Sequence, residues 1–319
     1  MNGNLQKQRV KEITEQLEQG IKDLFESEQY RKWLITMSRF HQYSLNNTIL
    51  ICMQKPDASL VAGFHAWKKM GRHVKKGEKG ILILAPIRYV REQPNAEEEP
   101  RESHEAEKEK TEKKEIICTG YKVVSVFDVS QAEGRELPSI GVNELTGDVE
   151  TYQQFFEALK KSCPVPIELE SIRNGAKGYF HQTENRIAIQ EGMSQVQTLK
   201  TIIHEMAHQK LHSMQGGPAD LTPVQRIISR NAKEVEAESV AFTVCQHYGI
   251  DTSDYSFAYI ASWSEGKEIP ELKQSMDTIR KAASELICEI ERHLPGREEL
   301  QMDLEKRPQN IRNNRKSCR

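Results

Sequence analysis

The alternation of apolar and polar positions predicts both helices and strands in the first half of the chain. Over residues 6–28, apolar residues recur at spacings of three and four with charged residues between them, as in an amphipathic helix. Two continuous apolar runs predict strands at Gly80–Val90 and Tyr121–Val129. Further helices are predicted at Trp33 and Leu34, at Leu45–Gln54 behind an N-cap Ser44, and at Trp67–Met70.

The second half shows the same mixture. A helix near 150–161 precedes three short strand candidates, at Ile167–Glu170, Gly178–His181 and Arg186–Gln190, the last two joined as a hairpin. Helices are then predicted from Ser194 to about Met214, from about Pro223 to Tyr248, and from about Pro270 to His293. We therefore predict an α+β fold of two domains, over residues 1–140 and 148–295, with the boundary within Glu133–Asp148.

Two segments carry charge without apolar residues to pack. Residues 91–115 hold ten acidic and six basic residues, so they cannot bury enough surface to offset the entropy of ordering. We expect a disordered loop there, inserted between the two strands of the first domain. Residues 296–319 form a basic tail that we expect to be frayed.

Composition narrows the class of protein. The chain has 319 residues and a formal net charge of −2, so overall charge does not indicate a nucleic-acid-binding protein. It contains no apolar run of the roughly 18–20 residues that a membrane span needs, and the polar start Met1–Gln8 is unlike a signal peptide. Its six cysteines form no C-x-x-C pair, which favours reduced thiols over a cysteine zinc cluster. A cytoplasmic location is expected.

The motif His204-Glu205-Met206-Ala207-His208 predicts a metal site. On a helix, residues four apart face the same side, so both imidazoles can bind one zinc ion. The glutamate between them, Glu205, is placed to act as general base on a water molecule activated by zinc.

The third ligand has to come from elsewhere. Leu211 and Met214 exclude the type of site that continues H-E-x-x-H with a further glycine and histidine. His212 also fails, because it lies about 80° around the helix from His204.

The next predicted helix supplies better candidates. Glu234 and Glu238 share one face of that helix, whereas Glu236 points elsewhere. We assign Glu234 to the metal and Glu238 to a hydrogen bond with a ligating histidine. The reverse assignment stays open, as does an acidic face that is only solvated. The residue that would stabilise a transition state cannot be chosen among the nearby His247, Tyr248 and Tyr255.

These residues resemble a known class of zinc proteins. The pair His204 and His208, followed by Glu234-x-x-Ala237 on the next helix and preceded by a hairpin, is similar to gluzincins. The closest likeness is to the compact ImmA/IrrE-type and ArdC-type zincin domains. The resemblance implies that the edge strand before the motif, about Arg186–Gln190, holds an extended peptide. Glu238 departs from the ImmA pattern, which has asparagine there, and matches ArdC-like sequences.

Positive charge is concentrated in residues 31–90. This region holds eleven basic and two acidic residues, a net charge of 11 − 2 = +9, with aromatic residues interleaved. Lysines that follow phosphates and rings that stack on bases are how proteins hold single strands. The alternative is that Trp33, Phe64 and Trp67 are core residues and the lysines are only solvated.

The first half also resembles a specific family, the ArdC-type antirestriction proteins. The resemblance covers most of residues 5–135 and rests on Tyr43-Ser44-Leu45-Asn46-Asn47, Gln54-Lys55-Pro56, Gly63-Phe64, Trp67, Gly71-Arg72, Lys76-Gly77-Glu78-Lys79-Gly80 and Val126-Phe127-Asp128-Val129-Ser130-Gln131. It implies an N-terminal domain that binds single-stranded DNA and a zincin-like C-terminal domain, in a protein encoded on plasmids and conjugative elements. The acidic insert at 91–115 departs from the family pattern.

Carried onto this sequence, the resemblance implies a set of DNA-binding residues. Phosphates would be bound by Lys68, Lys69, Arg72, Lys75, Lys76 and Lys79. Tyr43, Phe64 or Trp67 would stack on bases, and Asn46 and Asn47 would either bond bases or cap a helix.

We therefore expect a single-stranded DNA-binding antirestriction or conjugation-accessory protein of a mobile element, with one Zn²⁺ on His204, His208 and Glu234. The alternative is a zinc-dependent endopeptidase that cleaves a host regulator or restriction component and uses DNA for recruitment. A third possibility is an interaction protein whose zinc is structural. Whether the chain is an enzyme stays open.

Overall fold

A computed structural model describes residues 2–92, 114–137, 149–173, 175–213, 223–255, 257 and 260–294. Most of the predicted insert (93–113), most of the predicted boundary (138–148) and the predicted tail (296–319) lie outside these ranges. In the part of the chain that it describes, the structure combines helices with two antiparallel sheets and one mixed sheet, which fits the α+β class. None of the helices in the described ranges is long and apolar enough to cross a membrane.

Three helices open the chain: α1 (Asn2–Asp23), α2 (Ser27–Arg39) and α3 (Leu45–Gln54). The single helix predicted over 6–28 is wrong at its end, because the chain turns between α1 and α2. Leu24 and Phe25 continue the apolar spacing of Leu17 and Ile21, so the periodicity gave no sign of the turn. Ser44 does cap α3, its hydroxyl accepting a hydrogen bond from the Asn47 backbone N–H at 3.4 Å.

The first half is completed by two small sheets. β3 (Ile81–Glu92) and β4 (Lys114–Asp128) pair along their length, and β1 (Val61–Gly63) adds to the other side of β4. β2 (Arg72–Val74) pairs with β5 (Ala132–Gly134), next to α4 (Phe64–Lys69) and the short helix η1 (Val129–Gln131). Glu92 pairs with Lys114, so the predicted loop over 91–115 is wrong at both ends, where the strands continue.

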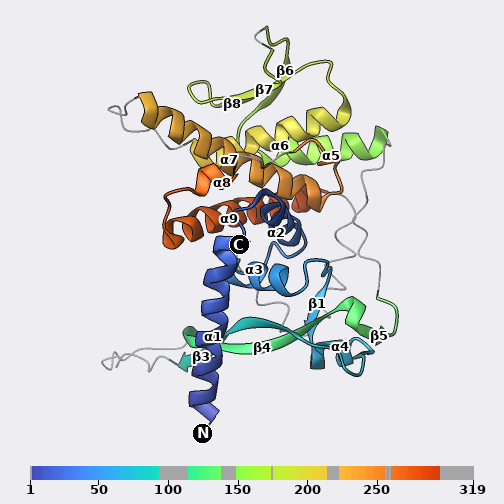
Figure 1. Cartoon of the computed structure of the whole chain (residues 1–319). Helices are drawn as coiled ribbons and strands as arrows, with labels where there is room; N and C mark the ends of the chain where they lie inside the picture. Colours follow the sequence, from blue (N-terminus) through green and yellow to red (C-terminus); the bar gives the residue numbers. More distant parts are fainter. Residues whose placement is uncertain are drawn as a thin grey trace, which may run out of the picture.

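The second half is a layer of helices beneath a small sheet (Figure 1). The helices are α5 (Val149–Ser162), α6 (Gln195–His212), α7 (Pro223–His247), α8 (Ile260–Ser264) and α9 (Ile269–His293). The sheet has the order β6 (Ile167–Glu170), β8 (Arg186–Gln190), β7 (Gly178–His181). The prediction that Arg186–Gln190 is an edge strand is wrong: it pairs with a neighbour on both sides, and Gly178–His181 lies at the edge.

The main hydrophobic core is continuous between the two halves. It contains buried residues of α1, α2 and α3 together with those of α5, α6, α7 and α9. Tyr30 of α2 is completely buried, its hydroxyl is 2.9 Å from Ser239 Oγ of α7, and its ring lies 5.4 Å from that of Phe257. The first three helices therefore share their apolar contacts with the second half of the chain. The division at 140–148 stays a proposal.

Candidate functional site

The two histidines of the sequence motif lie on one face of α6, as their spacing requires. Ser194 caps this helix by accepting a hydrogen bond from the Gln197 backbone N–H at 3.3 Å. The Nε2 atoms of His204 and His208 are 3.0 Å apart. Helix α7 packs against α6 and brings Glu234 Oε2 to 3.6 Å from His204 Nε2 and 3.4 Å from His208 Nε2. The three predicted ligands therefore converge.

This geometry fits a divalent cation. Ligands 2.0–2.1 Å from a tetrahedral zinc ion lie about 3.3 Å from one another, close to the three spacings here. Imidazole nitrogens and a carboxylate oxygen are also ligands that zinc accepts. Hydrogen bonds from His204 and His208 hold the pKa of Glu234 far below its usual range.

Glu205 borders a cavity beside this cluster. The cavity has a volume of about 350 Å³, and its lining includes Gly178, His204, Glu205, Glu238 and Tyr255. Glu205 is only 7% exposed, and burial raises the pKa of its carboxyl. A buried carboxylate with a raised pKa accepts and returns a proton more readily near neutral pH than an exposed one. Glu238, which also lines the cavity, has a pKa raised to about 7, chiefly by burial.

The other residues considered for this site take different places. His212 Nε2 lies 3.3 Å from the Lys233 carbonyl oxygen, and burial lowers the pKa of the His212 imidazole to about 4. His247 Nδ1 donates to the Ser38 carbonyl oxygen, and the Tyr248 hydroxyl donates to that of Ile287. Of the three residues named for transition-state stabilisation, Tyr255 lines the cavity.

Sequence reasoning missed Lys200, which also lines the cavity. Its side chain is buried, forms an ion pair with Asp254 and lies with Nζ 4.9 Å from the centre of the Tyr255 ring. Lys200 lies one helical turn before His204, and this spacing could have predicted that both residues lie on the same face of α6. Lys200 ties the segment carrying Asp254 and Tyr255 to the helix that carries the histidines.

The predicted DNA-binding residues fall into an exposed group and a structural group. Phe64 begins α4 and is 51% exposed. Exposed lysines lie on α4 and on the loop between β2 and β3: Lys68, Lys69, Lys75, Lys76 and Lys79. Of these, Lys75 donates from Nζ to the Ser130 carbonyl oxygen at 2.9 Å.

Trp67 and Asn47 have structural roles. Trp67 is completely buried and donates from Nε1 to the Phe127 carbonyl oxygen, so it offers no ring face to a base. The buried amide of Asn47 pairs with the backbone of Leu84, donating to its carbonyl oxygen and accepting from its N–H, each at 2.9 Å. This amide joins α3 to β3 and is not free to bond a base.

Arg72 and Tyr43 are also held by the fold. The Arg72 guanidinium donates to the carbonyl oxygens of Arg135 and Ala132. Tyr43 packs edge-on against Phe40, with ring centres 5.8 Å apart. Asn46 is half-buried at the start of α3.

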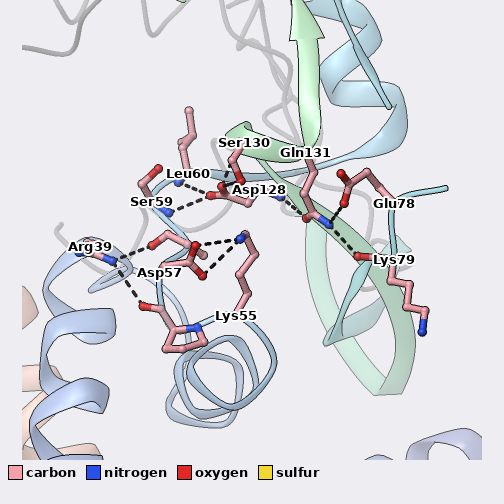
Figure 2. A network of polar contacts seen from close by, with 12 residues as sticks. Arg39, Lys55, Asp57, Ser59, Leu60, Glu78, Lys79, Asp128, Ser130 and Gln131 are labelled. Carbon is pink, nitrogen blue, oxygen red and sulfur yellow. Dashed lines mark hydrogen bonds and ion pairs between the residues drawn. The ribbon is translucent and has the colours of Figure 1, made fainter. Parts of the chain in front are cut away.

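Asp128 fixes the turn over residues 128–131, which lies beside the loop that carries Lys79 (Figure 2). Its carboxylate accepts hydrogen bonds from the backbone N–H groups of Ser59 and Leu60 and from Ser130. Burial raises the pKa of Asp128, but these hydrogen bonds outweigh it and hold the pKa below its usual value.

The same turn reaches the basic loop through Gln131. The Gln131 side chain accepts from the Asp128 N–H and donates to Glu78 Oε2 and to the Lys79 carbonyl oxygen, as Figure 2 shows. The Val126–Gln131 segment noted in the sequence therefore positions the basic loop.

A comparison with known families supports the interpretation of this half. Residues 3–127 match the family model of the N-terminal domain of anti-restriction factor ArdC. This match confirms the predicted resemblance of the first half to ArdC. It ends at residue 127, before the His204–His208–Glu234 cluster.

Individual proteins are similar over more of the chain. An uncharacterized protein of Bacillus anthracis, pXO2-81, is 30% identical in an alignment of 297 positions that covers 85% of this chain and 48% of that protein. This chain spans about half the length of that curated relative. The metal-free crystal structure of antirestriction protein ArdC from plasmid R388 has 21% identity and a TM-score of 0.45, covering 79% of this chain and 85% of that one. Its Mn(II)-bound form has 18% identity, a TM-score of 0.45, and coverage of 80% and 86%.

Proposed function

We propose that this chain is an ArdC-like antirestriction or conjugation-accessory protein of a mobile element, which binds single-stranded DNA in the cytoplasm. The match of residues 3–127 to the ArdC N-terminal domain is the observation that carries this proposal. The segregated positive charge of the same region is consistent with it, because the affinity of proteins for single strands rests largely on phosphate contacts.

The proposed DNA face consists of Phe64 and the five exposed lysines on α4 and the β2–β3 loop. The Phe64 ring is available for stacking on a base, and Lys68 and Lys69 follow it one turn later on α4. Lys75, Lys76 and Lys79 lie on the loop that Gln131 holds, so three exposed lysines extend from a fixed backbone, with Lys75 Nζ bonded to the Ser130 carbonyl oxygen.

The test is fluorescence anisotropy of labelled single-stranded DNA with the full chain, with duplex competitor and a salt titration. We expect binding that prefers single strands and weakens steeply with salt. Replacing Lys75 and Lys76 by glutamine should lower the salt slope by about 2 × 0.7. The matched control replaces the adjacent lysines Lys160 and Lys161 of α5, and should leave the slope unchanged. Equal effects of the two pairs would reject the proposed face.

The second part of the proposal concerns the metal centre. His204, His208 and Glu234 would hold Zn²⁺, which acts as a Lewis acid toward a water molecule or a peptide carbonyl. Glu205 would take a proton from that water on its carboxylate. Glu238 would hydrogen-bond His204 and keep the ring oriented. An extended peptide would lie along β7, whose residue Gly178 lines the same cavity.

The alternative function is a zinc-dependent endopeptidase that acts on a host regulator or restriction component. The burial of Glu205 beside the cavity favours it, since a purely structural metal site needs no neighbouring base. Glu205→Gln separates the two functions in an assay of plasmid entry into a restricting host. Protection that survives the substitution supports the accessory function, and protection that is lost supports the endopeptidase.

A further inference from the structure

A second group of two histidines and one glutamate lies away from the cavity. His41 follows the end of α2, His247 is the last residue of α7, and Glu291 belongs to α9. One ligand atom of each lies within 4.8 Å of the others. The three residues are far apart in the sequence, and they meet where the first helices of the chain pack against the last ones.

His247 is oriented as metal-binding histidines commonly are. Its Nδ1 donates to the Ser38 carbonyl oxygen at 2.8 Å, so Nε2 faces the other side of the ring. Histidines that bind metals usually donate their other ring N–H to a carbonyl or carboxylate in this way. Nε2 lies 3.5 Å from Glu291 Oε1. Two ligands of one zinc ion lie about 3.3 Å apart, so this spacing suits a shared ion.

His41 completes the group in a similar arrangement. Its Nδ1 lies 3.3 Å from the hydroxyl of Ser284 on α9. The rings of His41 and His247 meet edge-on, with centres 5.1 Å apart and planes at 79°. The corresponding values for His204 and His208 are 4.7 Å and 77°. The two pairs of rings therefore present their nitrogens in nearly the same relative orientation.

The surroundings differ from those of the first cluster. His41 is only 6% exposed, and the side chains of His247 and Glu291 are 17% and 26% exposed. Burying three polar groups together is costly unless a proton or a cation compensates them. Imidazole and carboxylate together suit divalent transition metals, and three such donors leave one position of a tetrahedral zinc ion to a water molecule.

We propose that His41, His247 and Glu291 form a second binding site for a divalent transition-metal ion of the zinc type. The bound ion ties the end of α2 to α7 and α9, and so cross-links the ArdC-like first part of the chain to the part that carries the first cluster. The three ligand atoms now lie within 4.8 Å of one another, and ligands of one zinc ion lie about 3.3 Å apart. Side-chain rotation can bring them to that distance when the ion binds.

The test counts metal ions in the full, untagged chain. The protein is stripped of metal, dialysed against free zinc in the micromolar range, and analysed for zinc per chain. We expect two ions in the wild type and one in the double variant His204→Gln, His208→Gln. Adding Glu291→Gln to that double variant should remove the remaining ion. Adding Glu289→Gln is the matched control and should leave it bound, because Glu289 is a partly exposed residue of the same helix whose carboxylate faces Arg292.

Two results would overturn the proposal: a double variant that retains no zinc while its circular dichroism shows a native fold, or a retained ion that Glu291→Gln does not remove. If the double variant does not fold, cobalt in the otherwise wild-type chain replaces it. Glu291→Gln should then halve the visible absorption of bound cobalt, and Glu289→Gln should leave it unchanged. Equal absorption in both would also overturn the proposal.

Discussion

The two clusters of histidine and glutamate use the same three donor groups in different surroundings. The Glu234 side chain is 49% exposed and its cluster borders a cavity, whereas the Glu291 side chain is 26% exposed and its cluster lies between packed helices. Each cluster supplies three donors and leaves the fourth position of a tetrahedral zinc ion without a protein ligand, so the two clusters differ in how accessible that position is. The comparison teaches that the identity of the donor groups alone does not assign a role to a metal site. Access of solvent or substrate to the site, and a base beside it, assign the role.

The largest expected effect lies at the cluster of His204, His208 and Glu234, called the open cluster because it borders the cavity; the cluster of His41, His247 and Glu291 is called the closed cluster. Glu205→Gln removes the group that would accept a proton, so peptide hydrolysis should fall by about 10²–10⁴-fold while zinc content stays the same. A quenched fluorescent peptide library measures the rate, with Glu191→Gln on the exposed turn after β8 as control. Hydrolysis that persists in the variant would remove Glu205 from the mechanism. A wild type that hydrolyses nothing would reduce the open cluster to metal binding alone.

The open cluster could be predicted from the sequence because its geometry is local. The four-residue spacing of His204 and His208 fixes their common face once the segment is helical, and Glu234 needs only one neighbouring helix. The closed cluster could not be predicted, because residues 41, 247 and 291 share no spacing and meet only through the packing of α2, α7 and α9. Short-range periodicity carries no information on such a contact.

The contrast between local spacing and tertiary packing also explains why the DNA-binding predictions for Trp67 and Asn47 were not supported by the structure. Helix and strand positions followed from apolar periodicity, but periodicity did not show that the Trp67 ring turns inward to the Phe127 carbonyl oxygen. Nor could it show that the Asn47 amide pairs with Leu84, 37 positions away along the chain. Aromatic and amide side chains serve a core or a ligand equally well, so only tertiary contacts decide between them.

The second largest effect is the stabilisation of the fold by zinc at the closed cluster. In the variant His204→Gln, His208→Gln, zinc can act only at the closed cluster, where it links elements of both halves. At a free zinc concentration of 100 times Kd, it should stabilise the chain by about 2.7 kcal/mol. This raises Tm by about 5 °C for a chain of this size, as measured by thermal denaturation. Magnesium serves as the control ion, and a zinc-independent Tm would contradict a cross-linking role.

A smaller effect sharpens the assignment of the third ligand at the open cluster. Glu234→Gln should weaken zinc binding by at least tenfold, about 1.4 kcal/mol, because an amide oxygen is a poorer ligand than a carboxylate. Glu236→Gln is the control, because the charged groups that act on the Glu236 carboxyl are Lys267 and Lys233 rather than the two histidines. Competition with a chelating dye, in a background with Glu291→Gln, isolates the open cluster. If Glu238→Gln has the larger effect, the reverse assignment of the two glutamates is correct.

The smallest effect concerns the hydroxyl beside His41. Ser284 Oγ lies 3.3 Å from His41 Nδ1, at the long end of a hydrogen bond, so its removal should cost about 0.5–1 kcal/mol. Ser284→Ala should therefore lower zinc affinity at the closed cluster about threefold, measured in the His204→Gln, His208→Gln background. Ser264→Ala, which removes an exposed hydroxyl on α8, should leave the affinity unchanged. An affinity lowered more than a hundredfold would make Ser284 part of the ligand set, and an unchanged affinity would mean that it only packs beside the ring.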